Sequence, residues 1–277
     1  MSLHRSRTMC LLLLISAIVL TACGGGTDAP PPLPPPVAPC VIPSAASVSG
    51  QTLARIGAYY FDGWAGALDT PHFHGLVSGP YESREPLSGW QDNTACSVEQ
   101  QLAWAHNSGI DFFVFDWYFK PEQNYGEPLN TALQATHALA NRHGMQFAIL
   151  YVDADPFLVR SPDWAATIDE WMGYFTDPAY VLVNGKPLFI VIDMHAMRDA
   201  VGSSAAVVAA FDQLRAAAAA HGFPGVYIVG GFGLPDGTSG QAGYFPELSI
   251  AQADGYDAVT TYNYPYGPPA FDGMLPY

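Results

Sequence analysis

The chain has 277 residues, of which 49% are hydrophobic and 13% are charged, a composition that excludes an intrinsically disordered protein. Its 25 acidic and 10 basic residues give a net charge of −15. This charge argues against surface binding of nucleic acid or anionic lipid, because both are polyanions. Aromatic residues make up 13% of the chain, and many aromatics together with many acids suit ligands rich in hydroxyl groups.

The N-terminus has the features of an export signal. Two arginines precede the apolar run LLLLISAIVL at 11–20, which is too short for a stable membrane-spanning anchor. The following LTAC, residues 20–23, resembles the lipobox of bacterial lipoproteins, in which the chain is cleaved before the cysteine and the cysteine is lipidated. We expect residues 1–22 to be a lipoprotein signal peptide and Cys23 to carry lipid, which would anchor an exported protein in the bacterial cell envelope. The alternative is an ordinary secretory signal that is cleaved nearby.

A proline-rich linker is expected at residues 23–50, before a domain at 51–277. The run APPPLPPPVAP at 29–39 favours polyproline II, a stiff spacer that holds a domain away from a membrane. Cys40 and Cys96 remain as thiols of the mature, exported chain. A Cys40–Cys96 disulfide is one expectation in an oxidising compartment, and two separate thiols are the other.

Six buried strands are expected, because six short apolar runs are bounded by turn residues and alternate with helical patterns. These runs lie at 56–61, 110–115, 145–152, 188–192, 226–230 and 256–262. An Asn184-Gly185 turn before the fourth run predicts a hairpin there.

Helices are expected between these strands. The first starts at Ser97, where Gln100 completes a capping-box spacing, and ends before Gly109. The third starts with Ser161 as N-cap and Pro162 in its first position, and its apolar residues repeat at helical spacing. That apolar face comprises Trp164, Ile168, Trp171 and Phe175, and the other helices are expected at 128–143, 204–221 and, weakly, 246–253.

Strands that alternate with helices predict an α/β protein with a parallel sheet. Two architectures fit, a (β/α)8 TIM-type barrel and an open doubly wound sheet. The open sheet usually carries a glycine-rich phosphate turn after its first strand, whereas this chain has DGWAG there with no helix directly behind it. We therefore expect an incomplete (β/α)8 barrel with about six βα units.

Four of the six strands end on an acid, namely Asp62, Asp116, Asp153 and Asp193. In a barrel all strand ends lie at the face where active sites are built, so these carboxylates are expected to share a pocket with Tyr262 from the sixth strand. Each acid could instead cap a helix or a turn. Asp116 is the strongest candidate because Trp117 and Tyr118 follow it, although Trp117 could equally be a core residue.

Other kinds of site find little support. His72 and His74 form an HFH motif, but a metal site needs further ligands, so solvated histidines or ligand contacts are the preferred interpretation. The glycine-rich run at 229–237 is not followed by a helix that could receive a phosphate. No metal and no cofactor is expected, and no protein partner is evident.

Five segments occur in the order found in the glycoside hydrolase family 99-like domain, which includes endo-acting α-mannosidases and WbsX-like proteins. The sequence resembles this family over about residues 55–264, in GAYYFDGW at 57–64, REPLSGW at 84–90, QLAWAHNSGIDFFVFDWYF at 101–119, DPAYVLVNGKPLFIVID at 177–193 and YDAVTTYNY at 256–264. The resemblance implies a (β/α)8 barrel that acts on glycans. It also implies two catalytic glutamates in a motif late in the barrel, and no segment of this chain matches that motif. The sequence is therefore expected to be either a fragment or a degenerate, non-catalytic relative.

The combined hypothesis is a lipid-anchored, glycan-active protein whose family cleaves mannan-like or bacterial polysaccharides with two carboxylates. The alternative is a lipid-anchored glycan-binding protein without turnover. Asp116 is the one candidate for a catalytic role. The candidate substrate-binding residues are Tyr59, Tyr60, Asp62, Trp64, Trp117, Tyr118, Asp153, Asp193 and Tyr262.

Overall fold

The computed structural model describes most of the predicted domain. The chain divides into two units, residues 1–39 and 40–277, and every described residue belongs to the second. The predicted signal peptide, Cys23, Cys40 and nearly all of the linker therefore lie outside the described residues. The described residues are 41, 42, 44, 54–65, 84, 86, 89–90, 94–232 and 244–262, without the side chains of 244–247.

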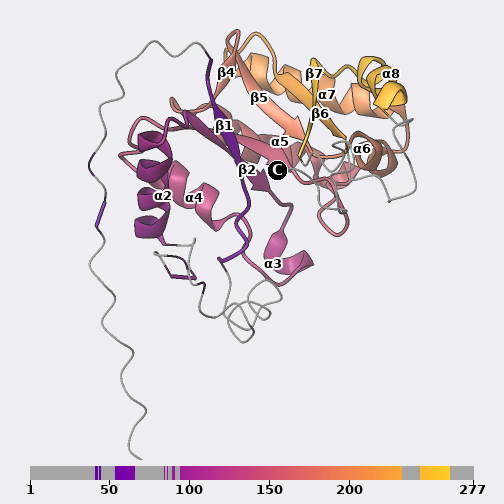
Figure 1. The fold of residues 1–277 in the computed structure, drawn as a ribbon. Helices are drawn as coiled ribbons and strands as arrows, with labels where there is room; N and C mark the ends of the chain where they lie inside the picture. Colours follow the sequence, from indigo (N-terminus) through magenta and orange to yellow (C-terminus); the bar gives the residue numbers. More distant parts are fainter. Residues whose placement is uncertain are drawn as a thin grey trace, which may run out of the picture. The chain divides into compact units, whose positions relative to one another are not determined.

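A curled sheet of six parallel strands forms the centre of this unit (Figure 1). Within the described residues its order follows the chain without reversal, so each parallel strand pairs with the one before it. The strands are β1 (Gly57–Tyr60), β2 (Phe112–Trp117), β3 (Gln146–Tyr151), β5 (Lys186–Val191), β6 (Tyr227–Phe232) and β7 (Ala258–Thr261).

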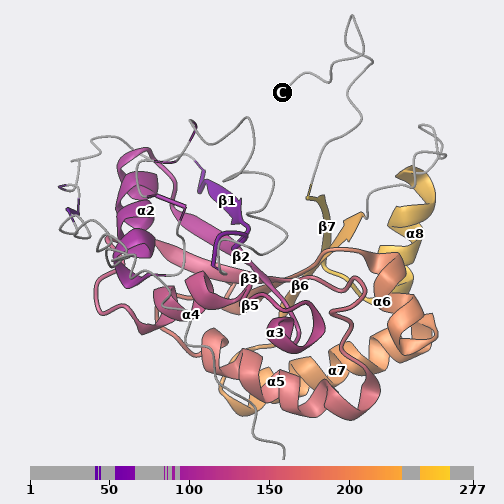
Figure 2. The ribbon, with the colours of Figure 1, turned by 90° about the horizontal axis from the view of Figure 1, so that it is seen from below.

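The strand order decides between the two predicted architectures. A doubly wound sheet reverses its order at a switch point, whereas a barrel adds strands in sequence. Figure 2 shows the sheet curling between its edges, β1 and β7, with α4, α5 and α7 on its outer side. The fold is therefore an incomplete (β/α)8 barrel, as predicted. The short strand β4 (Leu182–Val183) pairs antiparallel with β5 through Asn184 and Gly185, both at positive φ, which confirms the hairpin.

The helices differ from the predictions mainly at their ends. Helix α2 (Ala95–Asn107) begins earlier than predicted, because the hydroxyl of Thr94 caps it by accepting from the Ser97 N–H at 3.1 Å. Helix α4 (Thr131–Ala138) is shorter than the predicted 128–143. Ser161 is the first residue of α5 (Ser161–Phe175), and Arg160, not Ser161, occupies the N-cap position.

Helices α7 (Ser204–Ala220) and α8 (Tyr244–Asp254) were predicted, whereas two others were not. The unpredicted helices are the single-turn α3 (Pro121–Asn124), which follows β2, and α6 (Met194–Val201), which follows β5. Both lie directly beyond the carboxyl end of a strand, and both therefore border the face where the candidate site is expected.

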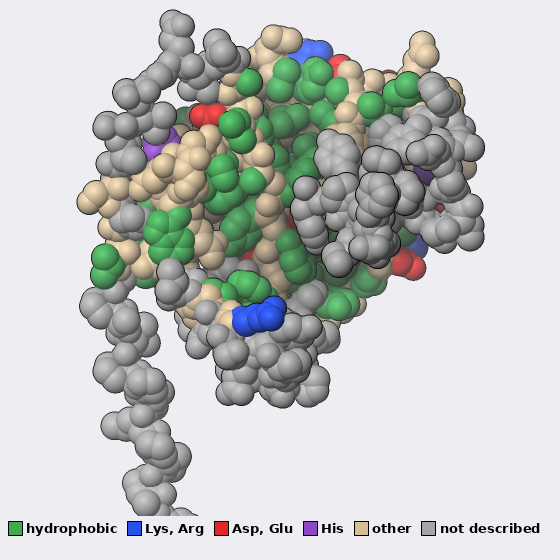
Figure 3. All heavy atoms as spheres, in the orientation of Figure 1, with side chains coloured by type: hydrophobic (Ala, Val, Ile, Leu, Met, Phe, Trp, Pro, Cys, Tyr) green, Lys and Arg blue, Asp and Glu red, His purple; other side chains and the backbone are tan. Residues whose placement is uncertain are grey.

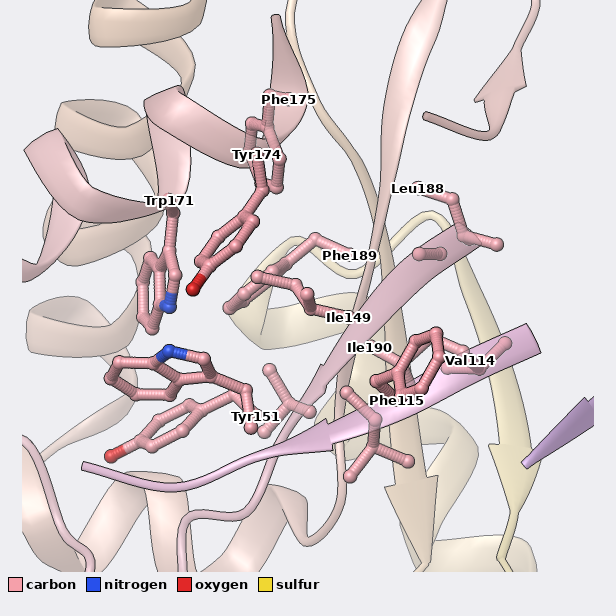
Figure 4. Close-up of a cluster of buried hydrophobic side chains, with 14 of the residues drawn as sticks. Val114, Phe115, Ile149, Tyr151, Trp171, Tyr174, Phe175, Leu188, Phe189 and Ile190 are labelled. Atoms are coloured by element: carbon pink, nitrogen blue, oxygen red, sulfur yellow. The ribbon is translucent and has the colours of Figure 1, made fainter. Parts of the chain in front are cut away.

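The main core fills the layer between the sheet and α5. The predicted apolar face of α5 is buried, and Trp171 is completely enclosed. In Figure 4, Trp171 and Phe175 point toward Tyr151 and Phe189 of the sheet. The ring centroids of Trp171 and Phe189 are 4.7 Å apart. Burial of one such aromatic side chain stabilises the fold by about 1.5–3 kcal/mol, so this layer contributes strongly to the stability of the unit.

The opposite side of the sheet, called here the concave face, lies between the two edge strands. Figure 3 looks onto this face, and hydrophobic side chains run across its middle. Side chains of the two edges meet over it: the Tyr59 and Thr260 hydroxyl oxygens are 3.2 Å apart, and the ring centroids of Tyr59 and Tyr262 are 4.9 Å apart. The first and last parallel strands of the described sheet are thus joined by side chains instead of by backbone pairing.

Candidate functional site

The candidate site is centred on Asp116, the fifth residue of β2. Strand alternation directs its side chain to the concave face, and only 4% of the residue is exposed. Two tyrosine hydroxyls donate hydrogen bonds to its Oδ2, from Tyr262 at 2.9 Å and from Tyr118 at 3.4 Å. Its other oxygen, Oδ1, is buried and has no hydrogen-bond partner among the described residues. One carboxylate oxygen is thus held in place, and the other can accept a further donor.

Burial raises the pKa of Asp116 from 3.8 to about 7, although the hydrogen bonds from Tyr262 and Tyr118 partly oppose this effect. Burial and the neighbouring Asp116 carboxylate raise the pKa values of Tyr118 and Tyr262 as well. Both phenols are therefore neutral donors in the physiological range. Asp116 is the group that changes charge near neutral pH, and it can both accept and donate a proton there.

Asp62 lies near this cluster but has a structural task. The carboxylate is buried, and its Oδ2 accepts from the backbone N–H of Ala132 at 2.6 Å, in the first turn of α4. Asp62 thus satisfies a helix N-terminus that is 70 residues away in the chain. Its charge also helps to raise the pKa of Tyr118, although burial is the largest cause. The capping alternative therefore accounts for the hydrogen bond of Asp62.

Asp153 and Asp193 form a second pair, after β3 and β5. Oδ1 of Asp193 accepts from the N–H groups of His195 and Ala196, which makes it the N-cap of α6. Asp153 is completely buried, and its Oδ1 accepts from the Asp193 N–H at 2.9 Å. Burial raises the pKa of Asp153 well above its usual range. No hydrogen bond joins this pair to Asp116 within the described part of the chain, so the four strand-end acids do not form one hydrogen-bonded cluster.

The predicted aromatic residues divide between the two faces of the sheet. Tyr59 lies on the concave face beside Tyr262. Tyr60 lies on the other face, where its hydroxyl donates to Gln101 of α2 and its ring packs against Phe115. Trp64 packs edge-on against Trp90 with their ring centroids 5.3 Å apart.

The structure places Trp117 in the core instead of beside the Asp116 carboxylate. Its indole N–H donates to Glu170 of α5 at 3.1 Å, and its ring centroid is 5.1 Å from that of Trp171. A period of two along β2 sends neighbouring side chains to opposite faces, so Asp116 and Trp117 cannot line the same surface. The core-packing alternative accounts for Trp117.

Replacing Trp117 by phenylalanine is therefore expected to lower stability and to leave glycan binding unchanged. The variant loses the hydrogen bond to Glu170 and part of the buried ring, at a cost of about 1–3 kcal/mol in the free energy of unfolding. Urea denaturation measures this cost, and binding titration measures the affinity. A loss of glycan affinity with unchanged stability would contradict the core-packing role and would show that Trp117 contacts the ligand.

Three aromatic residues near Tyr118 were not predicted to belong to the site. Phe61 contacts Tyr118 with their ring centroids 6.4 Å apart, and Phe157 contacts it at 4.8 Å. Tyr125 continues the series, at 5.8 Å from Phe157. Phe61, Tyr118, Phe157 and Tyr125 are called the aromatic row below. Phe61 could have been identified because it is the last residue of the first predicted strand, whereas no local pattern marks Phe157 or Tyr125.

The remaining predicted features are only partly described. His72 and His74, with most of the glycine-rich run, lie outside the described residues. Within the described ranges, no group of three or more histidine, cysteine or acidic side chains is placed to hold a metal ion. No described helix has the length and apolar character needed to cross a membrane. Cys96 forms a disulfide, and its pairing with Cys40 stays a prediction because Cys40 is not described.

Comparisons with known proteins find similarity only among solved structures, since no protein-family model and no curated protein matches the sequence. One similar structure is a glycoside hydrolase-like protein with 18% identity and a TM-score of 0.47, over 75% of this chain and 58% of that chain. The GH99 endo-α-mannosidase from Bacteroides thetaiotaomicron is similar in two structures. One of them, a complex with bis-tris-propane, has 16% sequence identity and a TM-score of 0.47, and the match covers 76% of this chain and 60% of that chain. The other has 15% sequence identity and a TM-score of 0.40, and the match covers 77% of this chain and 85% of that chain.

The chain thus spans less than two thirds of the length of the first two of these structures. The family of the endo-α-mannosidase is the one that the sequence motifs resemble.

Proposed function

We propose that this protein binds a glycan at the carboxyl ends of β1, β2 and β7, with Asp116 as the central polar group. The observation that carries the proposal is the state of Asp116. It is a buried carboxyl with a pKa of about 7, two tyrosine donors on one oxygen, and an acceptor oxygen that no described residue occupies. A sugar hydroxyl is a donor of the size and polarity that such an oxygen requires.

The same group can take part in chemistry. A carboxyl whose pKa is near 7 populates both protonation states at neutral pH, which is the requirement for a general acid or base. We assign Asp116 the role of catalytic participant, as a donor of a proton to a leaving-group oxygen or as an acceptor of a proton from water. Such proton transfer contributes about 10²–10⁴-fold to a rate.

Glycoside hydrolysis by the usual mechanisms requires a second carboxyl group. Among the other strand-end acids, Asp62 and Asp193 hold helix N-termini, and Asp153 accepts from backbone at the β5 end. These contacts occupy one oxygen of each acid, and the proposal assigns no second carboxyl group. The capping roles favour a second candidate function, a glycan-binding protein without turnover, which needs no second carboxyl.

The proposed location is the bacterial cell envelope, with the chain anchored by lipid on Cys23. The disulfide at Cys96 supports export, because disulfides persist in oxidising compartments. The negative net charge supports a neutral ligand over a polyanionic one.

Substitution of Asp116 by asparagine tests the proposal. The full chain is titrated with soluble α-mannan, dextran and galactan, and reducing ends are measured with the same polysaccharides. We expect wild-type binding to at least one of them and a loss of about tenfold or more in the variant, since hydrogen bonds to a charged group contribute about 1.5–3 kcal/mol.

The exposed Asp169 of α5 offers a matched control, and Asp169→Asn should bind as the wild type does. Unchanged affinity in Asp116→Asn would remove Asp116 from the binding site. New reducing ends from the wild-type protein, absent in the variant, would favour the hydrolase over the binding protein.

A further inference from the structure

We propose that the aromatic row, Phe61, Tyr118, Phe157 and Tyr125, is a stacking surface for a pyranose ring of the glycan. It extends the site from Asp116 toward solvent and sets the position of the sugar next to the carboxyl group. The inference rests on the proposed function, and it adds the residues that bind the apolar side of the sugar.

All four rings lie on the carboxyl side of the sheet. Phe61 directly follows β1, Tyr118 directly follows β2, and Phe157 lies in the connection after β3. Tyr125 ends α3, and Figure 1 shows α3 beyond the carboxyl end of β2. Segments that are far apart in the chain therefore bring one row of rings to the mouth of the half-barrel, where ligand sites of this fold are built.

The row has two exposed members and two buried ones. Phe61 and Tyr125 are 43% and 41% exposed, whereas Tyr118 and Phe157 are buried. Phe157 contacts both tyrosines of the row, and the backbone of Tyr118 is held by Asn130, which accepts from its N–H and donates to its carbonyl. The exposed rings are thus carried on a fixed base, which lowers the entropy that a ligand loses on binding.

The chemistry of the row favours a sugar over a wholly apolar ligand. A pyranose has an apolar C–H face and hydroxyl groups around its rim. Aromatic rings pack against the C–H face, and polar groups bind the hydroxyl groups. The Tyr118 hydroxyl links the row to Asp116 at 3.4 Å, so apolar and polar surfaces adjoin. A lipid or an apolar protein surface over the same place would offer no donor to the Asp116 Oδ1.

Leucine substitutions at Phe61 and Tyr125 test the row, because leucine keeps an apolar side chain but removes the flat ring. The full chain is titrated with α-mannan, dextran and galactan. We expect each variant to raise the Kd of the bound polysaccharide about 2- to 12-fold, the effect of losing one aromatic contact. Alanine substitutions at the same positions should weaken binding at least as much.

Trp104 provides the matched control, since it is 39% exposed. It lies in the last turns of α2, which leads to the amino end of β2, at the opposite end of the sheet. Trp104→Leu should leave the Kd unchanged. Circular dichroism and urea midpoints show that each variant is folded, and if a leucine variant does not fold, Phe61→Tyr and Tyr125→Trp, which change ring polarity and size, should still shift the Kd.

The outcomes separate this inference from the proposed function. If Asp116→Asn loses binding while both leucine variants bind as the wild type does, the row is not the stacking surface and the proposed function stands. If Trp104→Leu weakens binding as much as the row variants do, the effect is unspecific and the inference is overturned. If the wild-type protein binds none of the polysaccharides, both the function and the row are overturned.

Discussion

Asp116→Asn is expected to be more stable than the wild-type protein at pH 8 by about 2–4 kcal/mol in the free energy of unfolding, and nearly equal to it below pH 4. The reason is that the native fold buries a carboxyl group whose pKa is raised to about 7, from 3.8 in an exposed chain. At pH 8 the folded protein holds an ionised Asp116 in a buried environment that favours the neutral form, and this destabilises the fold. Asparagine is neutral at every pH and avoids this cost.

The direction follows from proton binding. Between about pH 4 and pH 7 the folded protein keeps the Asp116 proton and the unfolded chain releases it. The contribution of this group is therefore fully present below pH 4 and is lost as pH rises through 7.

Urea denaturation of both proteins at intervals from pH 4 to pH 8 measures this difference. The exposed Asp169 again supplies the control, since Asp169→Asn removes a carboxyl group that is not buried and should change stability only slightly. A constant difference between Asp116→Asn and the wild type over this range would mean that Asp116 is ionised throughout and that its acid–base role is wrong.

The substitution Arg198→Met is expected to lower the free energy of unfolding by about 3–5 kcal/mol, the second large effect. The Arg198 guanidinium donates twice to Asp254, from Nε at 2.6 Å and from Nη2 at 2.8 Å, and Asp254 is completely buried. Ser204 also donates to Asp254. The cluster joins α6, α7 and α8, so Arg198→Met would leave an uncompensated carboxylate where three helices meet.

The double variant Arg198→Met, Asp254→Leu should recover much of this loss, because an apolar pair can replace a buried ion pair at little cost. The control is Arg160→Met. Arg160 and Asp155 are 3.9 Å apart and are both mostly exposed, so its loss should change stability by less than about 1 kcal/mol. Thermal and urea unfolding measure all three, and equal losses at Arg198 and Arg160 would contradict the buried-pair interpretation.

The strands could be predicted because each is a dense apolar run, and their parallel order follows from the helices between them. Their ends were less certain. Strand β2 was predicted at 110–115 and occurs at Phe112–Trp117, so Asp116 lies within the strand and not after it. That shift matters for the site, because within a strand the alternation of side chains separates Asp116 from Trp117.

The helix caps show where sequence analysis reached its limit. Asp193 carries a local signal, since an acid before a run of helix formers is a common N-cap, and α6 could have been predicted from it. Asp62 carries no such signal, because the helix that it caps lies 70 residues further along the chain. The contacts of Phe157 depend in the same way on a connection whose path is set by tertiary packing.

The joining of the two sheet edges has a consequence for how the site forms during folding. The Tyr59–Thr260 contact spans 201 residues of chain and the Tyr262–Asp116 hydrogen bond spans 146, whereas neighbouring strands pair over far shorter loops. Closing a long loop costs more chain entropy than closing a short one, and this cost precedes the stabilisation that the contact provides. Such contacts therefore form late. The Tyr262–Asp116 hydrogen bond is therefore expected to form after the sheet has assembled, and it reports on a late step of folding.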